Sequence, residues 1–340
     1  MAKKIVVITG GSGYIGSVLT PLVVEAGFKV RVLDRFFFGD TLPQSPNIEK
    51  IKIDSRSISK EHLSDVFAVL DLAAISNDPA GELDPNKTLD INYRARRRLQ
   101  EMSAEAGVDR YVLASSCSVY GFQDGELNED SATNPLTTYA EANLKSEESA
   151  LDLFRKGTDM GVTLFRQATM YGLSPRMRFD LAINGMTLGM WKDGSIPMLR
   201  DGTQWRPMIH IRDTSKAFIS ALKADKALIS GQRFNVGSNE QNFQIRQLGE
   251  LVAKGVGKEF KFTWYGEPDH RSYRVNFDKI KRVLGFTPDW TPERGANEIS
   301  VALESGAVTA DIKTKTLAWY SELIEWERRI RELAPDGRIL

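Results

Sequence analysis

Residues that bind metals or form disulfides are scarce in this chain. Its 340 residues include one cysteine, Cys117, and three histidines. One thiol excludes an intrachain disulfide framework and a multi-cysteine metal site. So few histidines also argue against a histidine-rich zinc centre. We therefore expect no bound metal and a reduced, cytoplasmic environment.

The chain also lacks an excess of charge and long apolar runs. Lysine and arginine together number 45, as do aspartate and glutamate, so the formal net charge is zero. No overall field would attract nucleic acid or an anionic membrane. The first apolar run, residues 5–8, is too short for a signal peptide, and no later run could span a membrane. A hydrophobic content of 41% nevertheless supports a large core, in one large domain or two interleaved lobes.

The most informative motif is a glycine-spaced turn directly after that first apolar run. It contains Gly10, Gly13 and Gly16, and Gly16 falls where a helix is expected to begin. Such a turn brings backbone N–H groups and the positive end of a helix to a pyrophosphate. Asp34 ends the next predicted strand, at about the twenty-residue distance of a carboxylate that binds the adenosine ribose. The pattern predicts a dinucleotide site; a glycine-rich hairpin turn is the alternative.

Strands and helices alternate through the first half of the chain. Strands are expected over residues 5–8, 29–33, 48–53, 68–74, 110–114 and 162–166, and helices over 90–106 and 137–154. The alternation predicts an α/β fold, a doubly wound parallel (Rossmann) sheet with helices on both faces. Ligands bind outside the carboxyl ends of such strands. The residues expected at these ends are Gly10, Asp34, Asp54, Ala73 and Ser116.

The pattern changes near residue 173, where short apolar runs rich in glycine, proline and methionine begin. We predict a dinucleotide-binding domain over residues 1–172 and a smaller, interleaved substrate-binding lobe over 173–340. A segment near 232–237 is expected to return to the main sheet as a strand. A helix from about 311 to 333 is expected to close the chain.

These motifs together resemble the extended short-chain dehydrogenase/reductase family, and in particular its NAD-dependent sugar-nucleotide epimerases and dehydratases. The resemblance extends from the glycine turn to about residue 292. Its motifs are residues 9–16, Asp34, Asp54, residues 72–74, Asn92, residues 115–121, Tyr139, residues 202–206, Arg271 and residues 279–286.

The resemblance implies NAD as the cofactor. The positions that it assigns to cofactor binding are Gly10, Gly13, Tyr14, Ile15, Gly16, Asp34, Asp54, Ser55, Leu72, Ala73, Ala74, Asn92 and Tyr139. Asp34 would repel a 2′-phosphate and so favours NAD over NADP, although Arg35 could accommodate such a phosphate. Asp54 and Ser55 match the position that contacts adenine; a cap at the end of a strand is the alternative.

The resemblance also implies the chemistry. Tyr139 matches the family's catalytic base, and Ser116 matches the hydroxyl that hydrogen-bonds the reacting sugar. In the family, a sugar hydroxyl gives its proton to the tyrosinate while its carbon gives a hydride to NAD⁺. The pKa of a tyrosine is ordinarily about 10 and must fall for this step to occur at neutral pH.

One catalytic position departs from the family pattern. The family has Tyr-x-x-x-Lys, but Asn143 stands four residues after Tyr139, and Glu147 keeps the register. The family lysine holds the nicotinamide ribose and lowers the tyrosine pKa. Asparagine can keep a ribose hydrogen bond but brings no charge, and Lys145 lies on another face of the predicted helix. Three explanations are open. Turnover is slow, the nicotinamide's own positive charge is sufficient to lower the tyrosine pKa, or the protein binds NAD and nucleotide sugars but is catalytically impaired.

The residues after Ser116 bear on the type of reaction. Family 4,6-dehydratases carry an Asp-Glu pair where this chain has Cys117 and Ser118. We therefore expect an epimerase that oxidises a sugar hydroxyl transiently to a ketone; a nucleotide-sugar dehydrogenase or reductase is the alternative. Cys117 could serve as a second acid or base, although a buried thiol without chemistry is the more ordinary interpretation.

The expected substrate is a nucleotide-diphosphate sugar, whose nucleobase and sugar the sequence does not predict. Guanidinium groups suit diphosphate oxygens, and residues 77–79 could cap the sugar pocket or form a plain turn. The residues assigned to substrate are Ser116, Cys117, Ser118, Asn77, Arg206 and Arg271.

Two further features concern phosphate contacts and assembly. Arg176 and Arg178 could add to the phosphate contacts, with a solvated surface position as the alternative. Family members often pair two helices across a dimer, so we expect a homodimer formed through residues 90–106 and 137–154.

Overall fold

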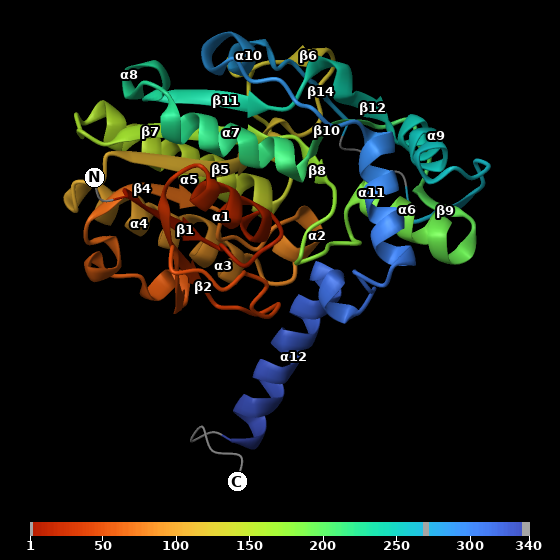
Figure 1. Ribbon diagram of the computed structural model, residues 1–340, viewed down its shortest axis with the longest axis horizontal. Coiled ribbons are helices and arrows are strands. Elements are labelled where there is room, and N and C mark those ends of the chain that lie inside the picture. The colour runs from red at the N-terminus through yellow and green to blue at the C-terminus, as the bar shows by residue number, and fades with distance from the viewer. Residues whose placement is uncertain (1–2, 268–271, 335–340) are drawn as a thin grey trace.

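A computed structural model describes residues 3–267 and 272–334. At its centre lies a parallel sheet of seven strands in the order β11-β7-β5-β4-β1-β2-β3 (Figure 1). These strands are β1 (Ile5–Thr9), β2 (Lys29–Asp34), β3 (Ile48–Lys52), β4 (Val66–Asp71), β5 (Arg110–Ser116), β7 (Gly161–Gln167) and β11 (Gln232–Val236). The predicted doubly wound α/β fold is therefore confirmed.

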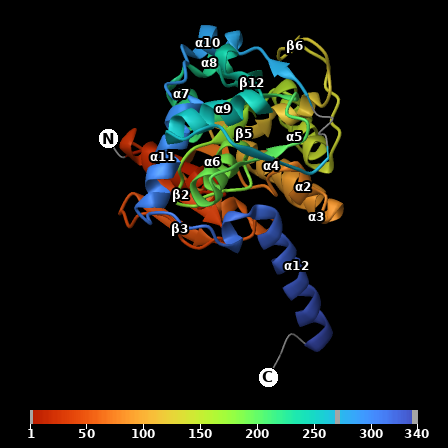
Figure 2. The same ribbon diagram turned by 90° about the vertical axis from the view of Figure 1, so that its right-hand side faces the viewer.

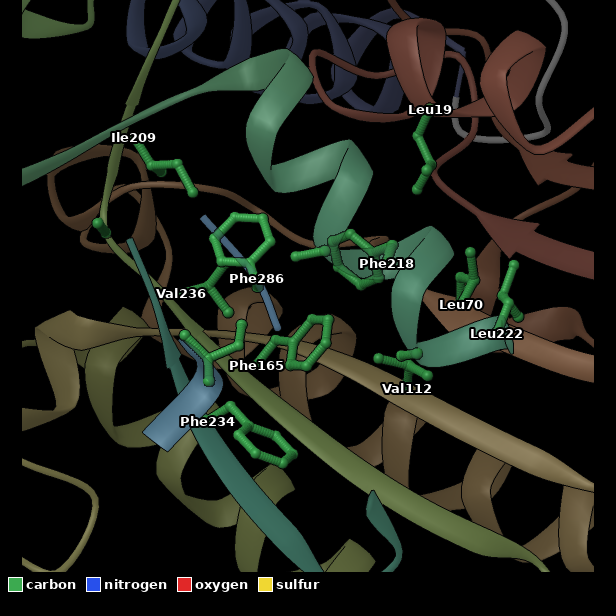
Figure 3. Packing of buried hydrophobic residues seen from close by; sticks show 14 of the residues in the cluster. Leu19, Leu70, Val112, Phe165, Ile209, Phe218, Leu222, Phe234, Val236 and Phe286 are labelled. Atoms are coloured by element: carbon green, nitrogen blue, oxygen red, sulfur yellow. The ribbon is translucent and has the colours of Figure 1, made fainter. Parts of the chain in front are cut away.

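Successive residues of a strand point to opposite faces of the sheet, and each face has its own apolar core. On one face Val6 and Ile8 of β1 join a cluster with Phe165 and Phe218, which Figure 3 shows. On the other face Val7 joins a second cluster. The longer helices that contribute to these cores include α1 (Gly16–Glu25) and α7 (Ile211–Lys223) for the first, and α4 (Arg96–Glu105) and α5 (Thr138–Arg155) for the second.

A smaller lobe is built mainly from residues after β7. It has a three-stranded sheet of β8 (Thr169–Tyr171), β10 (Trp205–His210) and β12 (Asn242–Gln244), and a pair formed by β9 (Ile196–Leu199) and β13 (Phe262–Tyr265). Its helices α6 (Ala182–Asp193), α9 (Ile245–Val256) and α11 (Pro292–Glu304) pack on one another. The chain passes from this lobe back to β11 beside β7. The division at residue 172 stays a prediction.

Short elements connect these parts. They are α2 (Asp78–Gly81), α3 (Pro85–Leu89), β6 (Glu126–Leu127) paired with β14 (Arg274–Val275), α8 (Lys226–Ile229) and α10 (Asp278–Leu284).

Two boundaries differ from the sequence predictions for clear reasons. The strand expected over 68–74 ends at Asp71, because the next two N–H groups, of Leu72 and Ala73, donate to Thr9 Oγ1 at 3.0 and 3.1 Å. The helix expected over 90–106 begins as a π-helix (Asp90–Ala95) and becomes α-helical only at Arg96. Both differences occur where the chain passes the carboxyl edge of the sheet.

The closing helix α12 (Thr316–Leu333) begins at Thr316 rather than near residue 311, after a 3₁₀ turn at Ile312–Thr314. Its start is held by Trp319, whose Nε1 donates to Phe37 O at 3.0 Å. Figures 1 and 2 both show that its C-terminal end extends away from the rest of the molecule. Among residues 3–267 and 272–334, no helix is both long and apolar enough to cross a membrane.

Candidate active site

A cleft of about 1100 Å³ lies at the carboxyl edge of the main sheet. Pockets for one drug-sized ligand measure about 300–1,000 Å³, so this cleft has room for a dinucleotide and a second ligand. The predicted contact residues that line it are Gly10, Gly13, Tyr14, Ile15, Gly16, Asp34, Asp54, Ser55, Leu72, Ala73, Ala74, Asn77, Ser116, Ser118, Tyr139 and Arg206. The fold therefore brings most of the predicted site together.

The glycine turn fits the phosphates of a dinucleotide. Gly10 has a φ of +67°, and a Cβ there would lie 3.0 Å from Ala73 N. A Cβ on Gly16 would lie 2.3 Å from Gly10 O, so both positions exclude a side chain. The N-cap residue of α1, Ile15, has no side-chain capping hydrogen bond, and this first turn is where phosphate oxygens bind in such folds.

Asp34 is oriented at the cleft wall by the backbone. Ser12 N and Phe36 N donate to its two carboxylate oxygens at 2.9 and 2.6 Å. Burial raises the pKa of Asp34, and these backbone donors oppose the rise. Each carboxylate oxygen can accept more than one hydrogen bond, so Asp34 can still accept from ribose hydroxyls.

Asp54 and Arg35 bear on the choice between NAD and NADP. Asp54 Oδ2 lies 2.5 Å from Arg35 Nη1 and 2.8 Å from Arg56 Nη2. The hydrogen bond from Arg56 is the main reason that the pKa of Asp54 is well below its usual value. Arg35, which could have accommodated a 2′-phosphate, is thus held by Asp54 and by the ring of Phe37, 4.3 Å away. This arrangement favours NAD.

The end of the cleft opposite the glycine turn contains Ser116 and Tyr139. Ser116 ends β5, and its Oγ accepts from Ser118 N at 3.1 Å, which leaves its O–H to donate. Tyr139 lies in the first turn of α5 and is packed by Gly81 of α2, where a Cβ would lie 3.0 Å from Tyr139 Cβ. Ser118 Oγ is buried and has no protein partner in the described part of the chain.

Opposing effects act on the Tyr139 phenol. Burial is the largest cause and raises the pKa of Tyr139, and the charge of Asp78 raises it further. Arg96 and hydrogen bonds with Ser116 and Asn143 lower it. The net shift is upward, so the protein groups alone do not activate this phenol.

Asn143 occupies the family's lysine position but does not line the cleft. It is 1% exposed, its Oδ1 accepts from Arg96 Nη1 at 3.0 Å, and its Nδ2 donates to Tyr139 O at 3.1 Å. Arg96 does line the cleft. The sequence analysis missed Arg96, which is one of four arginines between residues 94 and 98. Its helical spacing from the buried positions 92, 99 and 100 was the signal that distinguishes it.

Two predicted contact residues lie behind the cleft wall. Asn92 is fully buried and hydrogen-bonds Ile75 N and O at 2.8 and 2.9 Å, so it shapes the loop after β4 rather than facing a ligand. Cys117 is 1% exposed in the apolar core, and its thiol donates to Arg166 O at 3.3 Å. Burial raises the pKa of Cys117. The assignment of Cys117 to substrate is therefore corrected to a buried core thiol.

Asn77 and Arg206, which the sequence analysis assigns to substrate, both line the cleft. Asn77 Nδ2 donates to Asp180 Oδ2 at 3.0 Å, and its Oδ1 accepts from Ala80 N at 2.8 Å, so Asn77 caps the short helix α2 (Asp78–Gly81) beside the cleft. Arg206 lies over the ring of Tyr273 at 5.5 Å. Arg271, the other predicted contact, lies outside the described residues.

Arg176 and Arg178 are buried in the cleft wall and are not solvated surface residues. Arg178 Nη2 pairs with Asp180 at 2.7 Å. Arg176 lies 3.6 Å over the Phe38 ring, and its Nε and Nη1 have no protein partner in the described part of the chain. Burial lowers the pKa of Arg176 to about 10. Such a guanidinium can bind a phosphate or another anion in the cleft.

The family model for the NAD-dependent epimerase/dehydratase family matches residues 6–237. The chain belongs to this family. Its members are NAD-dependent enzymes that act on nucleotide sugars, and NAD is the cofactor of this chain.

Curated relatives are similar over most of their length. The chain is 25% identical to the UDP-glucuronate 4-epimerase of Thermodesulfobacterium geofontis, over 85% of this chain and 92% of that protein. It is 27% identical to the UDP-glucose 4-epimerase of Corynebacterium glutamicum, over 88% of this chain and 95% of that protein. Among solved structures, MoeE5 in complex with UDP-glucuronic acid and NAD has a TM-score of 0.80 at 27% identity, covering 88% of this chain and 99% of MoeE5.

Proposed function

We propose that this enzyme epimerises a nucleotide-diphosphate sugar through transient oxidation of one sugar hydroxyl. The cleft carries the proposal, because it has a glycine turn suited to phosphates at one end and Ser116 with Tyr139 at the other. A cofactor held by the turn would extend toward the phenol, where a sugar hydroxyl can also reach.

In this mechanism Tyr139 takes the proton of the reacting hydroxyl while the carbon atom that bears this hydroxyl is oxidised to the carbonyl carbon of a ketone. Ser116, held by the N–H of Ser118, donates its own O–H to the reacting oxygen. NAD⁺, which the glycine turn at Gly10 and the carboxylate of Asp34 would hold when it is bound, would supply the hydride acceptor for the oxidation and the hydride donor for its reversal. Tyr139 gives the proton back to the same oxygen once the ketone has turned its other face. No external reductant is consumed, so the product is a stereoisomer of the substrate.

UDP-sugars are the first substrates to test. The two curated relatives named above carry the names of UDP-sugar 4-epimerases, and MoeE5 was solved with UDP-glucuronic acid. In this chain, Arg206 lines the cleft and provides a guanidinium group for the diphosphate of the substrate.

The experiment is to incubate purified protein and NAD with UDP-, GDP-, CDP- and dTDP-sugars and to identify products by NMR while recording NADH absorbance. A stereoisomer without net NADH supports epimerisation. Net NADH would instead identify a dehydrogenase. NAD and sugar-nucleotide binding without any turnover would identify the impaired binding protein that Asn143 suggests, and would overturn the proposal.

We further propose that the enzyme is a cytoplasmic homodimer paired through α4 and α5. These helices pack on each other within the chain, and their outer faces carry partly exposed side chains. Light scattering on the eluting peak of a size-exclusion column tests the assembly, and a monomer mass would contradict it.

A further inference from the structure

We propose that Arg96 provides the positive charge that the lysine of the Tyr-x-x-x-Lys pattern would bring, and that this charge comes from α4 instead of α5 and is held beside Tyr139 by Asn143. Arg96 would then be a positioning residue for the Tyr139 base. The proposal deepens the proposed function and rests on Tyr139 being the base.

The contacts of Arg96 hold its guanidinium between the sheet and α5. Its Nε donates to Ala73 O at 3.2 Å and lies 3.6 Å from Asp71 Oδ2. Its Nη1 faces the other way and donates to Asn143 Oδ1 at 3.0 Å. The side chain is 3% exposed yet lines the cleft. A charge held in this way cannot move away into solvent.

Asn143 lies between the Arg96 guanidinium and the main chain of Tyr139. While its Oδ1 accepts from Arg96, its Nδ2 donates to the carbonyl of Tyr139, one helical turn earlier. A lysine at position 143 would bring a second cation against the buried Arg96 guanidinium, and like charges at this separation repel. An uncharged hydrogen-bond acceptor at position 143 is therefore what a buried Arg96 requires.

Arg96 has a counterion, and the counterion is itself satisfied by other groups. Asp71 is 1% exposed and accepts from Thr9 Oγ1 at 2.6 Å and from the hydroxyl of Tyr111. These neutral donors stabilise the Asp71 charge on the sheet side. The end of the guanidinium that faces α5 is thus the positive end of the ion pair.

Taken together, burial and the other groups around Tyr139 raise the pKa of its phenol, so a nearby cation is needed to lower it. Burial raises the pKa of its phenol, and Asp78 at the start of α2 raises it further. Glu82, directly after α2, accepts from Thr138 N beside Tyr139 and adds a second carboxylate to this face. Ser116 and Asn143 contribute hydrogen bonds but no charge, whereas the positive charge of Arg96 lowers the pKa of the phenol. Opposite charges close to a titrating group shift its pKa by about 1–3 units.

The first test measures Tyr139 itself and needs no substrate. Ultraviolet phenolate absorbance is recorded against pH, with and without NAD, and the signal of the Tyr139→Phe variant is subtracted. Arg96→Met should shift the onset of the Tyr139 signal upward by about 1 pH unit, and Arg96→Lys should restore it. Arg97→Met is the matched control, because Arg97 is the next residue of α4, is 57% exposed and pairs with Glu101. If the Tyr139 signal is the same in the wild-type protein and in Arg96→Met, the proposal is overturned. The same holds if neither protein shows a Tyr139 signal.

Arg96→Met leaves Asp71 buried without its cation and can destabilise the fold. The second variant is therefore the double substitution Arg96→Met with Asp71→Asn, which removes both charges together. Circular dichroism confirms folding before each titration. The double variant should still show an upward shift, smaller than that of Arg96→Met because the negative charge of Asp71 is removed as well; a signal that matches wild type would count against Arg96.

A third variant places the positive charge at position 143 instead of position 96. Arg96→Gln combined with Asn143→Lys restores the family pattern and should recover the pH profile that Arg96→Gln alone loses. In turnover assays, Arg96→Gln should lower kcat at neutral pH about tenfold, with KM little changed, and the difference should shrink as the pH rises. A tenfold loss that is the same at every pH would indicate a merely structural role.

The results separate the two proposals. If no sugar nucleotide is turned over but the Tyr139 signal depends on Arg96, the epimerase proposal fails and the role of Arg96 stands. If wild type epimerises a sugar and Arg96→Gln has the same pH profile, the role of Arg96 fails and the epimerase proposal stands.

Discussion

Lys87 of α3 and Glu327 of α12 form an ion pair, with 3.0 Å between Nζ and Oε2. The pair joins the rim of the cleft to the C-terminal helix. Tyr320, Leu323 and Ile324 of the same helix line the cleft. Because the family model ends at residue 237, α12 lies outside the matched region, yet it lines the cleft in which we propose that NAD binds.

Truncation should therefore weaken NAD binding. A chain that ends at Lys315 loses the α12 wall, and we expect about tenfold weaker NAD binding, equivalent to about 1.4 kcal/mol. Glu327→Gln should have a smaller effect, because partly exposed ion pairs contribute about 0–1 kcal/mol. Fluorescence titration with NAD measures both. Glu332→Gln, on the same helix but outside the cleft, is the control, and unchanged affinity after truncation would show that α12 is not part of the NAD site.

Removal of either hydroxyl at the reacting end should abolish turnover without releasing the cofactor. For Tyr139→Phe and for Ser116→Ala we expect kcat to fall at least about 100-fold, because general base catalysis and hydrogen bonding to the reacting oxygen are lost. NAD affinity should change little, since the phosphate end is untouched. Tyr93→Phe provides a control for the loss of a tyrosine hydroxyl elsewhere. Normal turnover by Tyr139→Phe would contradict the assignment of the base.

Asp34 should set the preference for NAD. Asp34→Asn keeps an acceptor for one of the two backbone donors and removes the charge that repels a 2′-phosphate. The ratio of NADP to NAD affinity should rise about tenfold. Calorimetric titration of both dinucleotides gives the ratio, and Asp40→Asn, which removes a carboxylate that pairs with Lys50 at 2.8 Å outside the cleft lining, is the control. An unchanged ratio would place the adenosine ribose elsewhere.

The lone thiol should be inert in the folded protein. Cys117 is buried and burial raises its pKa, so both access and thiolate formation are disfavoured. A thiol reagent should modify Cys117 only after denaturation. Cys117→Ala should keep turnover and lose about 1 kcal/mol of stability through a small cavity. Rapid labelling of the native protein would contradict the buried position.

Stability should fall in mild acid because of His210. Its ring is fully buried, stacks on Trp290 at 3.9 Å, and has its pKa lowered by burial. The unfolded chain takes up the proton near about pH 6.5 while the folded chain does not, so stability is complete above that pH and is lost as pH falls toward the lower folded pKa. The loss should approach about 1 kcal/mol per pH unit. Denaturant unfolding at several pH values measures it, and His210→Gln should remove most of this pH dependence; the same slope in both proteins would exclude His210 as its source.

Features that depend on local spacing were predicted well from the sequence. The glycine turn, Asp34 and Ser116 lie in one cleft because they stand at the ends of strands that share a carboxyl edge, and Tyr139 lines the same cleft from the first turn of α5. Side-chain direction was harder to predict. Asn92 belongs to a family motif, yet it faces the loop after β4, and Cys117 turns into the core.

Contacts between distant segments could not be read from the sequence. Arg96 and Asn143 are adjacent only because α4 and α5 pack together. Likewise, α12 was expected as a terminal helix, but nothing in its spacing indicated that Tyr320 would line the cleft. Burial of Arg176 and Arg178 also depends on such tertiary packing, which overrides the usual preference of arginine for the surface.

The position of β11 at the edge of the main sheet has a consequence for biosynthesis. The edge of β7 is completed by residues 232–236, which leave the ribosome only after β8, β9 and β10. Until then, a nascent chain exposes an unpaired and largely apolar strand edge, the kind of edge that templates aggregation. We therefore expect translational stalling before residue 232 to yield an intermediate that chaperones recognise.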